Sequence, residues 1–376
     1  MADELIESIL NESRSFPPSK EFSNQANINE AKAEEMKKLA ADDHIKYWAK
    51  LANEELHWSR PFSNTLDDSK APNYEWFNDG EINASYNSLD VNVSKNPHKT
   101  AIIFEKEDGK SESITYKELL LKTSQFANGL KKIGVEPMDR VVIYMPMCPE
   151  AVIAMQACAR IGAIHSVVFG GFSSNALKDR IEDAQSKIVI TADGAFRGGG
   201  VIPLKQATDE AVSQSSFKVN NVVVFKRTGE NVNFNKGTDI WWEDLVADCD
   251  LVCEPKPLNA EHPLFILYTS GSTGKPKGIQ HATAGYILHA KTTFSWIFDI
   301  KNDDIFWCTA DVGWITGHTY VAYGPLLSGA TILIYEGAPT YPDVGRFWSI
   351  CEKHSVTIFY TAPTAIRALM KHGDEI

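Results

Sequence analysis

The chain has 376 residues, which at about 150 residues per domain predicts roughly two domains, or one large α/β domain with an added segment. Apolar residues make up 43% of the sequence and charged residues 23%, proportions typical of a folded globular protein, which exclude disorder as the dominant state. The 49 acidic side chains outnumber the 37 Lys and Arg, and the net charge of −12 excludes a general positive field that would attract nucleic acid.

The first part of the chain predicts an N-terminal extension. Residues 1–92 have helical or irregular patterns and include a turn-rich stretch with aromatic residues at Trp58, Trp76 and Phe77. The first thirty residues lack a basic segment followed by an apolar one, which argues against a secretory signal. From Lys99 the pattern changes to short β-branched runs separated by helical segments. We therefore expect an extension over residues 1–95 and a second domain over residues 96–376.

A helix is predicted to begin directly after Thr115. Thr115 and Glu118 have the spacing of a capping box, in which each side chain satisfies a free backbone amide at the helix start. The same helix is expected to end at Gly134.

Short apolar runs predict a mostly parallel sheet architecture. Helical segments alternate with most of these runs, and the absence of alternation between apolar and polar residues indicates strands that are buried on both faces. We therefore predict an α/β fold of mostly parallel sheets layered with helices. The predicted strands are Val141–Met145, Ile164–Phe169, Ile188–Thr191, Val222–Phe225, Phe265–Tyr268, Ile332–Tyr335 and Thr357–Tyr360.

Residues 151–172 form the most apolar stretch of the chain and raise the question of a membrane span. They include Gln156, Arg160 and His165, and two glycines near the end, so a buried helix that leads into a buried strand explains them better. We expect no membrane partner.

The last predicted element is a helix that begins at Pro363, a residue suited to the first helical turn. It would run through Ile366, Leu369 and Met370, and the sequence stops soon afterwards. We expect the fold to be cut at this point.

The six cysteines favour a reducing compartment. They stand at positions 148, 158, 249, 253, 308 and 351, and no pair has the C-x-x-C spacing of a zinc or redox site. Buried free thiols, Cys249 and Cys253 among them, and a cytoplasmic protein are the expectation.

Residues 268–278, with the sequence YTSGSTGKPKG, form the sharpest local motif and follow a predicted buried strand. Glycines let backbone amides approach an anion, hydroxyl groups donate hydrogen bonds, and lysines neutralise charge. The motif therefore predicts a phosphate-binding loop.

Two other interpretations of this loop are weaker. A plain surface turn does not explain two lysines in a glycine loop that follows a buried strand. A Walker loop requires a longer spacing between its glycines, with a hydroxyl residue after its lysine, where this chain has Pro276. Gly198, Gly199 and Gly200 likewise do not make a dinucleotide-binding motif, because Pro203 replaces the last glycine.

The loop resembles the signature loop of the adenylate-forming superfamily, which includes acyl-CoA synthetases, luciferases and peptide-synthetase adenylation domains. Further segments look like those of the acetyl-CoA synthetase family: FGGFS at 169–173, ADGAFRGG at 192–199, WCTADVGWITGH at 307–318 and YTAPTAIR at 360–367. The resemblance covers most of the chain. It implies the large N-terminal domain of the adenylate-forming fold, preceded by the extension typical of acetyl-CoA synthetases.

The resemblance implies an AMP-forming acetate–CoA ligase. In such a ligase, acetate attacks the α-phosphorus of ATP to give acetyl-AMP and pyrophosphate, and the thiol of CoA then displaces AMP. The implied small-molecule partners are acetate, ATP and CoA, with Mg²⁺ as a cofactor. By similarity, the β- and γ-phosphates of ATP would be held by Thr269, Ser270, Gly271, Ser272, Thr273, Gly274 and Lys275.

The resemblance also assigns an acyl pocket. Trp314, Ile315 and Thr316 match the family segment that lines this pocket, although an aromatic residue such as Trp314 is more often a core residue than a ligand contact. A lone histidine is usually structural, so His318 receives no role.

CoA-binding residues follow from the same comparison of motifs. Arg197 matches a family arginine that contacts the 3′-phosphate of CoA, and a guanidinium suits such a contact, although many arginines are only solvated. A second basic residue of the family is replaced by Gly200, and Lys205 could contribute instead. The other residues matched to the CoA path are Gly170, Gly171, Thr316 and Ala362.

Several family parts lie beyond Ile376, including the small C-terminal domain with its catalytic lysine. No catalytic residue or metal ligand is therefore assigned in this chain, and the chain alone is expected to lack full activity. Two alternatives stay open: a ligase for propionate or another short acid, and a non-catalytic nucleotide- or CoA-binding module. The sequence leaves the oligomeric state open.

Overall fold

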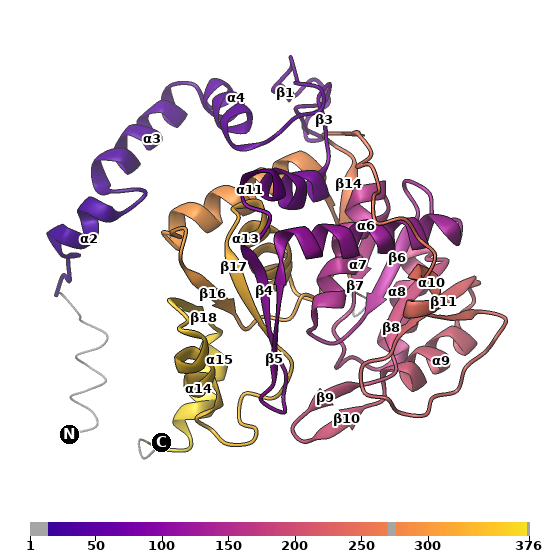
Figure 1. Cartoon of the computed structure of the whole chain (residues 1–376). Coiled ribbons are helices and arrows are strands. Elements are labelled where there is room, and N and C mark those ends of the chain that lie inside the picture. Colours follow the sequence, from indigo (N-terminus) through magenta and orange to yellow (C-terminus); the bar gives the residue numbers. More distant parts are fainter. Residues whose placement is uncertain (1–13, 270–275, 374–376) are drawn as a thin grey trace.

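Two mostly parallel β-sheets covered by helices make up the body of the molecule (Figure 1). The computed structural model describes residues 14–269 and 276–373. Within them, one sheet has seven strands in the order β12-β11-β8-β6-β7-β14-β15, and the other has five in the order β18-β16-β17-β4-β5. Only the pairs β14–β15 and β4–β5 are antiparallel in these two sheets. The prediction of an α/β fold with mostly parallel sheets is confirmed.

The seven-stranded sheet contains five of the predicted strands. All seven predicted strands are present in the two sheets, and their ends agree within two residues. The strands of the larger sheet are β6 Arg140–Tyr144, β7 Ile164–Val167, β8 Ile188–Ala192, β11 Asn221–Phe225, β12 Asp239–Trp241, β14 Pro263–Thr269 and β15 Lys277–Ala282.

The five-stranded sheet contains three strands that the sequence analysis did not predict. These are β4, β5 and β16, and β15 of the larger sheet was missed as well. The two edge strands β5 and β15 are mostly exposed and polar, so no apolar run marks them. The strands of the smaller sheet are β4 Thr100–Glu105, β5 Ser111–Thr115, β16 Ile305–Cys308, β17 Thr331–Tyr335 and β18 Ile358–Tyr360.

Helix α6 shows how the predicted start signal works. The hydroxyl of Thr115 accepts the Glu118 amide at 3.2 Å, and the Glu118 carboxylate accepts the Thr115 amide at 2.8 Å, so the predicted capping box is confirmed. Helix α6 then contacts α7 of the larger sheet and strands β4 and β5 of the smaller one. It therefore packs against both halves of the body.

The remaining helices follow the strands in chain order. Residues 151–172 form most of a fully buried helix, α7, and strand β7 after it, which confirms the soluble interpretation of this stretch. The helices are α6 Tyr116–Lys132, α7 Pro149–Ile161, α8 Ser174–Ala184, α9 Leu204–Gln214, α10 Trp242–Val246, α11 Thr283–Ile297, α12 Ile315–Gly317, α13 Gly324–Leu327, α14 Arg346–His354 and α15 Pro363–Met370, with a π-helical segment η2 at His318–Tyr323. Helix α15 begins at Pro363, as predicted.

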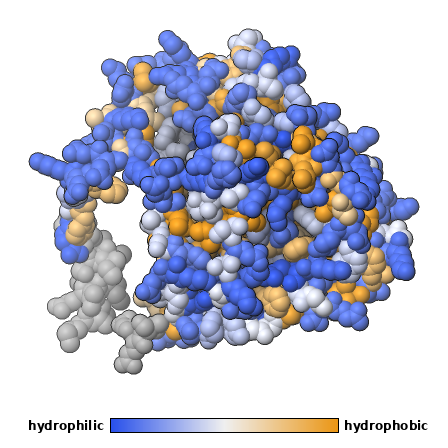
Figure 2. Space-filling view, in the orientation of Figure 1, coloured by the Kyte–Doolittle hydropathy of each residue, from blue (hydrophilic) through white to orange (hydrophobic). Residues whose placement is uncertain are grey.

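The N-terminal region forms an arm and a tightly packed part. Its elements are α2 Lys20–Gln25, α3 Glu30–Asp42, α4 His44–Glu55, β1 Leu66–Asp67, β2 Glu75–Trp76, β3 Glu81–Ile82, the π-helical segment η1 Tyr86–Asp90 and α5 Val91–Lys95. Helices α2 and α3 have no buried residue and stand away from the body, with a gap visible between them and the body in Figures 1 and 2. The later part is buried, and Asp90 forms an ion pair with Arg160 of α7 at 2.7 Å.

All six cysteines are free thiols. Cys148, Cys158, Cys253 and Cys308 are buried, whereas Cys249 and Cys351 are only half-buried, so the expectation of burial is wrong for Cys249. The side chain of Cys249 lies beside the exposed segment after α10 and donates to the Leu245 carbonyl at 3.3 Å.

A buried carboxylate holds helix α14 against the smaller sheet. Glu105, at the end of β4, is completely buried and pairs with Arg346 at 2.9 Å, Lys353 at 2.7 Å and His354 at 2.8 Å. Because these partners all lie on α14, the charge of Glu105 joins the helix to the strand.

We expect Glu105→Gln to lower the free energy of unfolding by about 3 to 5 kcal/mol, because it leaves the largely buried guanidinium of Arg346 without its counter-charge. The control Glu112→Gln breaks an exposed pair with Lys106 and should cost less than about 1 kcal/mol. Urea unfolding of both variants measures the difference. Equal losses in the two variants would contradict this role of Glu105.

Candidate functional site

A single large cleft lies where the ends of the two sheets meet, with a volume of about 1180 Å³. In parallel strands the carboxyl ends share one edge, and ligands bind preferentially in the crevice outside that edge. The residues that line the cleft follow β6, β7 and β8 of the larger sheet and β16, β17 and β18 of the smaller sheet. The cleft is therefore built by six strand ends that converge from two sheets.

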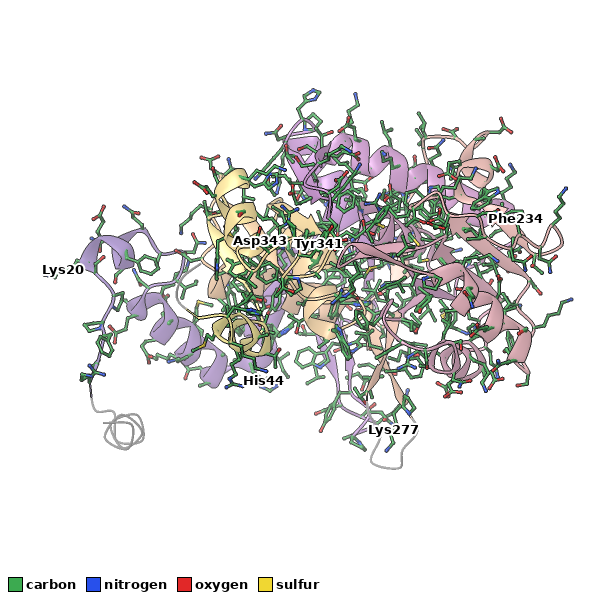
Figure 3. All side chains as sticks on the ribbon, turned by 90° about the horizontal axis from the view of Figure 1, so that it is seen from below. Lys20, His44, Phe234, Lys277, Tyr341 and Asp343 are labelled. Atoms are coloured by element: carbon green, nitrogen blue, oxygen red, sulfur yellow. The ribbon has the colours of Figure 1, made fainter. Side chains whose placement is uncertain are left out.

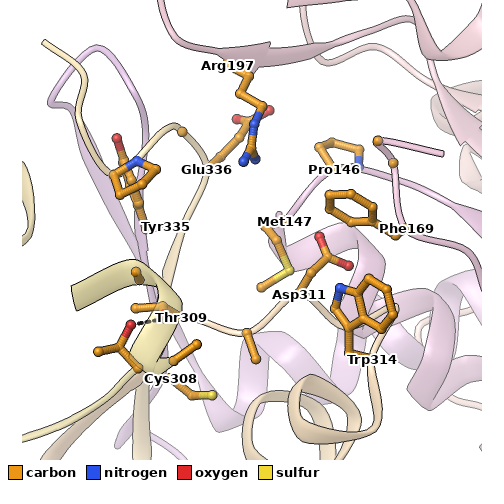
Figure 4. A pocket seen from close by; sticks show the side chains of 18 of the residues that line it. Pro146, Met147, Phe169, Arg197, Cys308, Thr309, Asp311, Trp314, Tyr335 and Glu336 are labelled. Carbon is orange, nitrogen blue, oxygen red and sulfur yellow. Dashed lines mark hydrogen bonds between the residues drawn. The ribbon is translucent and has the colours of Figure 1, made fainter. Parts of the chain in front are cut away.

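Seven of the residues predicted to bind acetate or CoA line this cleft. They come from four separate segments of the chain, and the structure brings all of them together. They are Gly170, Gly171, Arg197, Trp314, Ile315, Thr316 and Ala362. Figure 4 shows Arg197 at one side of the opening and Trp314, Phe169 and Asp311 at the other.

The segment that carries Trp314 lies directly against the end of β7. A side chain on Gly313 would come within 2.8 Å of the Phe169 backbone, and one on Gly317 within 2.0 Å of the Asp311 carbonyl, so both positions require glycine. The Val312 amide also lies 3.3 Å from the Met147 sulfur, which follows β6. The glycines that flank Trp314 thus allow the close backbone packing that places this segment in the cleft.

Trp314 is 47% exposed, so the core-packing interpretation of this side chain is wrong. Its ring lies 6.0 Å from that of Phe169 and 5.7 Å from that of Phe172, measured between ring centres. Ile315 is similarly exposed at 46%. Two large apolar side chains therefore face the open volume of the cleft, which suits a small apolar group of a ligand.

Hydroxyl groups fix the backbone around the cleft. Tyr144, at the end of β6, donates to the carbonyl of Phe172 at 2.8 Å and lies 3.2 Å from that of Gly170. On the other side, Thr309 and Thr361 share a hydrogen bond of 2.7 Å that joins the ends of β16 and β18, drawn as a dashed line in Figure 4. The cleft walls are therefore held by specific contacts and not by apolar packing alone.

Asp311 is a carboxylate of the cleft that the sequence analysis did not select. It follows β16 and accepts the Gly313 amide at 2.7 Å. Burial raises the pKa of its carboxyl group from 3.8 to about 6, although the Gly313 amide and the positive charge of Arg197 both act in the opposite direction. A raised pKa in a cleft is a frequent mark of a functional site.

Arg197 lies at the end of a short hairpin, β9 Ala195–Arg197 and β10 Gly200–Ile202. The residue is exposed, and its guanidinium points toward the cleft opening near Glu336 (Figure 4). Its side chain makes no hydrogen bond within the described residues, so the donors of the guanidinium are available to a ligand.

Lys205 does not support the predicted phosphate contact. The side chain is completely buried and pairs with Asp239 at 2.8 Å, with Asp209 at its other side. Its amino group also donates to the Asn233 carbonyl at 3.0 Å. The expectation that Lys205 replaces the basic residue missing at Gly200 is wrong, because two buried carboxylates already neutralise it and it does not line the cleft.

The phosphate loop joins the antiparallel strands β14 and β15. Ser270, Gly271, Ser272, Thr273, Gly274 and Lys275 lie outside the described residues. Thr269 pairs with Lys277 where the hairpin protrudes from the body (Figure 3), and neither residue lines the cleft. A strand follows the loop where a Walker motif requires a helix, which supports the rejection of that motif.

His318 is buried beneath the cleft. Its ring stacks on that of His165 at 5.5 Å, and burial lowers its pKa to about 3, so the ring is neutral at ordinary pH. It does not line the cleft, in agreement with the absence of an assigned role.

The structure adds cleft residues that the sequence did not single out. Met147, Tyr335 and Glu336 line the opening as well as Asp311. Each stands within three residues of the end of a buried parallel strand, and that position is the signal that could have identified them.

The part of the chain that the structure describes contains no group of three or more His, Cys, Asp or Glu side chains suited to hold a metal ion. In the same residues, each helix is too short or too polar to cross a membrane.

Comparisons with known proteins agree with these motifs. The model of the family "AMP-binding enzyme" matches residues 89–376, and the model "Acetyl-coenzyme A synthetase N-terminus" matches residues 33–88. The chain is 56% identical to the acetyl-coenzyme A synthetases of Chromobacterium violaceum, over 373 residues, and Thiobacillus denitrificans, over 374 residues. It is 54% identical to that of Pasteurella multocida over 370 residues. These alignments cover 98 to 99% of the chain but only 57% of each relative's length.

The pKa of Asp311 predicts a pH dependence of stability. With a folded-state pKa of about 6, above its usual 3.8, the stabilisation from the neutral carboxyl group is complete below pH 3.8 and is lost as the pH rises through 6. Asp311→Asn imitates the neutral form, so it should gain on the order of 2 kcal/mol relative to the wild type between pH 4 and pH 7. Urea unfolding across this range measures the gain, with the exposed Asp303→Asn as the control. A constant difference between Asp311→Asn and wild type would contradict the raised pKa.

Proposed function

This chain belongs to the family of AMP-binding enzymes, and on that premise we propose that it carries substrate sites of an AMP-forming acetate–CoA ligase. In the first step the acetate carboxylate attacks the α-phosphorus of ATP and releases pyrophosphate. In the second step the CoA thiol attacks the carbonyl of acetyl-AMP and releases AMP. The observation that carries the proposal is one cleft in which four separate segments, each similar to those of acetyl-CoA synthetases, place seven expected residues.

We divide the chain into an N-terminal extension, residues 1–95, and an AMP-binding domain, residues 96–376. The family models, which meet between residues 88 and 89, support a division near this point. The buried pair of Asp90 with Arg160 joins the two parts.

The proposed ATP-phosphate site is the loop from Thr269 to Lys275. Its support is the motif itself: amides freed by glycines, hydroxyl donors and a lysine, all near the end of strand β14. Preorganised donors of this kind stabilise the charge that develops on the phosphates as pyrophosphate leaves. The described residues offer no acidic cluster for Mg²⁺, so no step is assigned to the metal.

The proposed acyl pocket is formed by Trp314, Ile315 and Thr316. The exposed indole and the aliphatic side chain of Ile315 would pack against the methyl group of acetate and exclude water from the reacting carboxyl group. Thr316 also lines the cleft and offers a hydroxyl group beside the acyl carbon.

The proposed CoA path runs along the opposite part of the cleft. Arg197 would bind the 3′-phosphate through a bidentate contact, and Gly170, Gly171 and Ala362 leave room for the pantetheine chain. With Lys205 neutralised in the core, Arg197 is the cation that we assign to this phosphate. A cytoplasmic location, where CoA is available, fits the six free thiols.

Acetate-dependent exchange between ATP and labelled pyrophosphate tests the ligase proposal. Because the chain spans 57% of the length of its relatives, the assay is run on the chain alone and on the chain joined to the remaining C-terminal part of the C. violaceum relative. We expect clear acetate-dependent exchange from the joined protein and much less from the chain alone. Circular dichroism confirms that both proteins are folded.

The exchange assay also separates the proposal from its main alternative. A folded, joined protein that binds CoA but shows no exchange would contradict the ligase and support a non-catalytic binding module.

Acyl-chain selection provides a second test. Trp314→Ala removes a large side chain from the proposed pocket, so kcat/KM for propionate should rise relative to acetate by about tenfold or more, since one methylene contributes about 1 to 3 kcal/mol in such pockets. The exposed Trp348→Ala, outside the cleft, is the control. An unchanged ratio in Trp314→Ala would place the acyl group elsewhere. A wild-type preference for propionate would favour the short-chain alternative.

A further inference from the structure

The turn next to Arg197 has an unusual conformation. Gly198 and Gly199, which connect β9 to β10, have φ angles of +64° and +78°. Two left-handed residues between paired strands define a tight two-residue hairpin turn in which both amides point to one side. Arg197 pairs with Gly200 directly before and after this turn, so the turn determines where the Arg197 side chain starts.

Glu107 binds the amides of both turn residues. Its two carboxylate oxygens accept the Gly198 amide at 2.5 Å and the Gly199 amide at 3.0 Å. Glu107 is only 7% exposed and lies in the turn between β4 and β5, which Figure 1 shows beside the β9–β10 hairpin. A carboxylate of the smaller sheet thus holds a hairpin that belongs to the larger sheet's half of the molecule.

The same carboxylate is fixed from a third direction. Glu107 also accepts the amide of Ala338, after β17, at 3.1 Å. A side chain on Gly199 would come within 2.8 Å of the Tyr341 ring, so the turn fits closely against the segment that carries Ala338 and Tyr341. The turn therefore has one position relative to the end of the smaller sheet.

A second carboxylate binds the strand before the turn. Glu336 is almost completely buried, accepts the Phe196 amide at 3.1 Å and pairs with the guanidinium of Arg227. The Arg227 guanidinium in turn lies 5.1 Å from the centre of the Phe196 ring. Two buried carboxylates thus hold the backbone on both sides of Arg197, while the Arg197 side chain itself stays free of hydrogen bonds to the described residues.

We propose that Glu107 is a positioning residue for anion recognition by Arg197: by binding the amides of Gly198 and Gly199, its carboxylate sets the direction in which the guanidinium meets the 3′-phosphate of CoA. This inference rests on the proposed function. It extends it, because the specificity for a 3′-phosphorylated ligand then depends on a residue that does not touch the ligand and comes from a distant part of the chain.

The geometry distinguishes positioning from general stabilisation. Glu107 uses both oxygens on the turn and makes no ion pair within the described residues, whereas the nearby Glu105 makes three with α14. Its removal should therefore affect the ligand phosphate more than the rest of the cleft. Neutralising Glu107 while keeping its shape should preserve one amide contact and weaken the second.

The experiment compares the binding of CoA and 3′-dephospho-CoA, measured by isothermal titration calorimetry on the chain and on the joined protein described above. We expect the wild type to prefer CoA by about tenfold or more, the size of one charge-assisted contact. Arg197→Ala and Glu107→Ala should each abolish most of this preference, and the double variant should lose no more than either. Glu107→Gln should be intermediate. The affinity for 3′-dephospho-CoA should stay unchanged in all of them.

Asp108→Asn is the matched control. It lies next to Glu107 in the same turn, is exposed and contacts Lys110 instead of the hairpin, so the preference should remain that of the wild type. Amide hydrogen exchange gives a second measurement: Gly198 and Gly199 should be protected in the wild type and exchange faster in Glu107→Gln, while the amides of β6 keep their protection.

The outcomes separate the inference from the function on which it rests. If Arg197→Ala loses the preference and a folded Glu107→Ala keeps it, Glu107 has no positioning role and only the inference fails. If Arg197→Ala also keeps the preference, or the wild type has none, the proposed phosphate contact itself is overturned and the inference falls with it. If Glu107→Ala does not fold, the binding ratio and the glycine exchange rates of Glu107→Gln decide.

Discussion

Three buried carboxylates at the end of the smaller sheet hold together the segments that surround the cleft. Glu105 binds helix α14, Glu107 binds the turn of the β9–β10 hairpin, and Glu336 binds Arg227 and the strand that leads to Arg197. A carboxylate in a low-dielectric interior is stable only when several donors satisfy it. Each of these side chains therefore requires its partners, and the partners come from distant parts of the sequence.

This arrangement places rigid and open regions in a useful order. The strand ends and their carboxylates are buried and fully bonded, whereas the side chains that face the cleft, such as Arg197, Trp314 and Ile315, are exposed. Preorganised surroundings with free side chains at the surface are what a binding site for charged ligands needs, because little has to be ordered when the ligand arrives. The same logic accounts for Lys205, whose charge is used inside the core and is not available to a ligand.

The local patterns in the sequence were sufficient where one segment contains its own signal. The capping box of Thr115 and Glu118, the buried helix α7 and the start of α15 at Pro363 follow from neighbouring residues and were predicted correctly. The motif segments also named seven residues of the cleft. The polar edge strands β5 and β15 were missed because an exposed strand needs no apolar run, and Lys205 was misjudged because its partner Asp239 lies 34 residues away.

The sequence by itself determined the fold class, because apolar runs that alternate with helical segments can be buried only as helix-covered parallel sheets. It also determined the chemistry of the motifs, because glycine, hydroxyl and basic residues keep their properties in any fold. Only the tertiary structure decided which of these residues meet. Asp311 and Glu336 became cleft residues, Lys205 became a core residue and Glu107 became the partner of Gly198 and Gly199 through contacts across 91 or more positions in some cases. No local pattern encodes such contacts, since they depend on how the ends of two separate sheets converge.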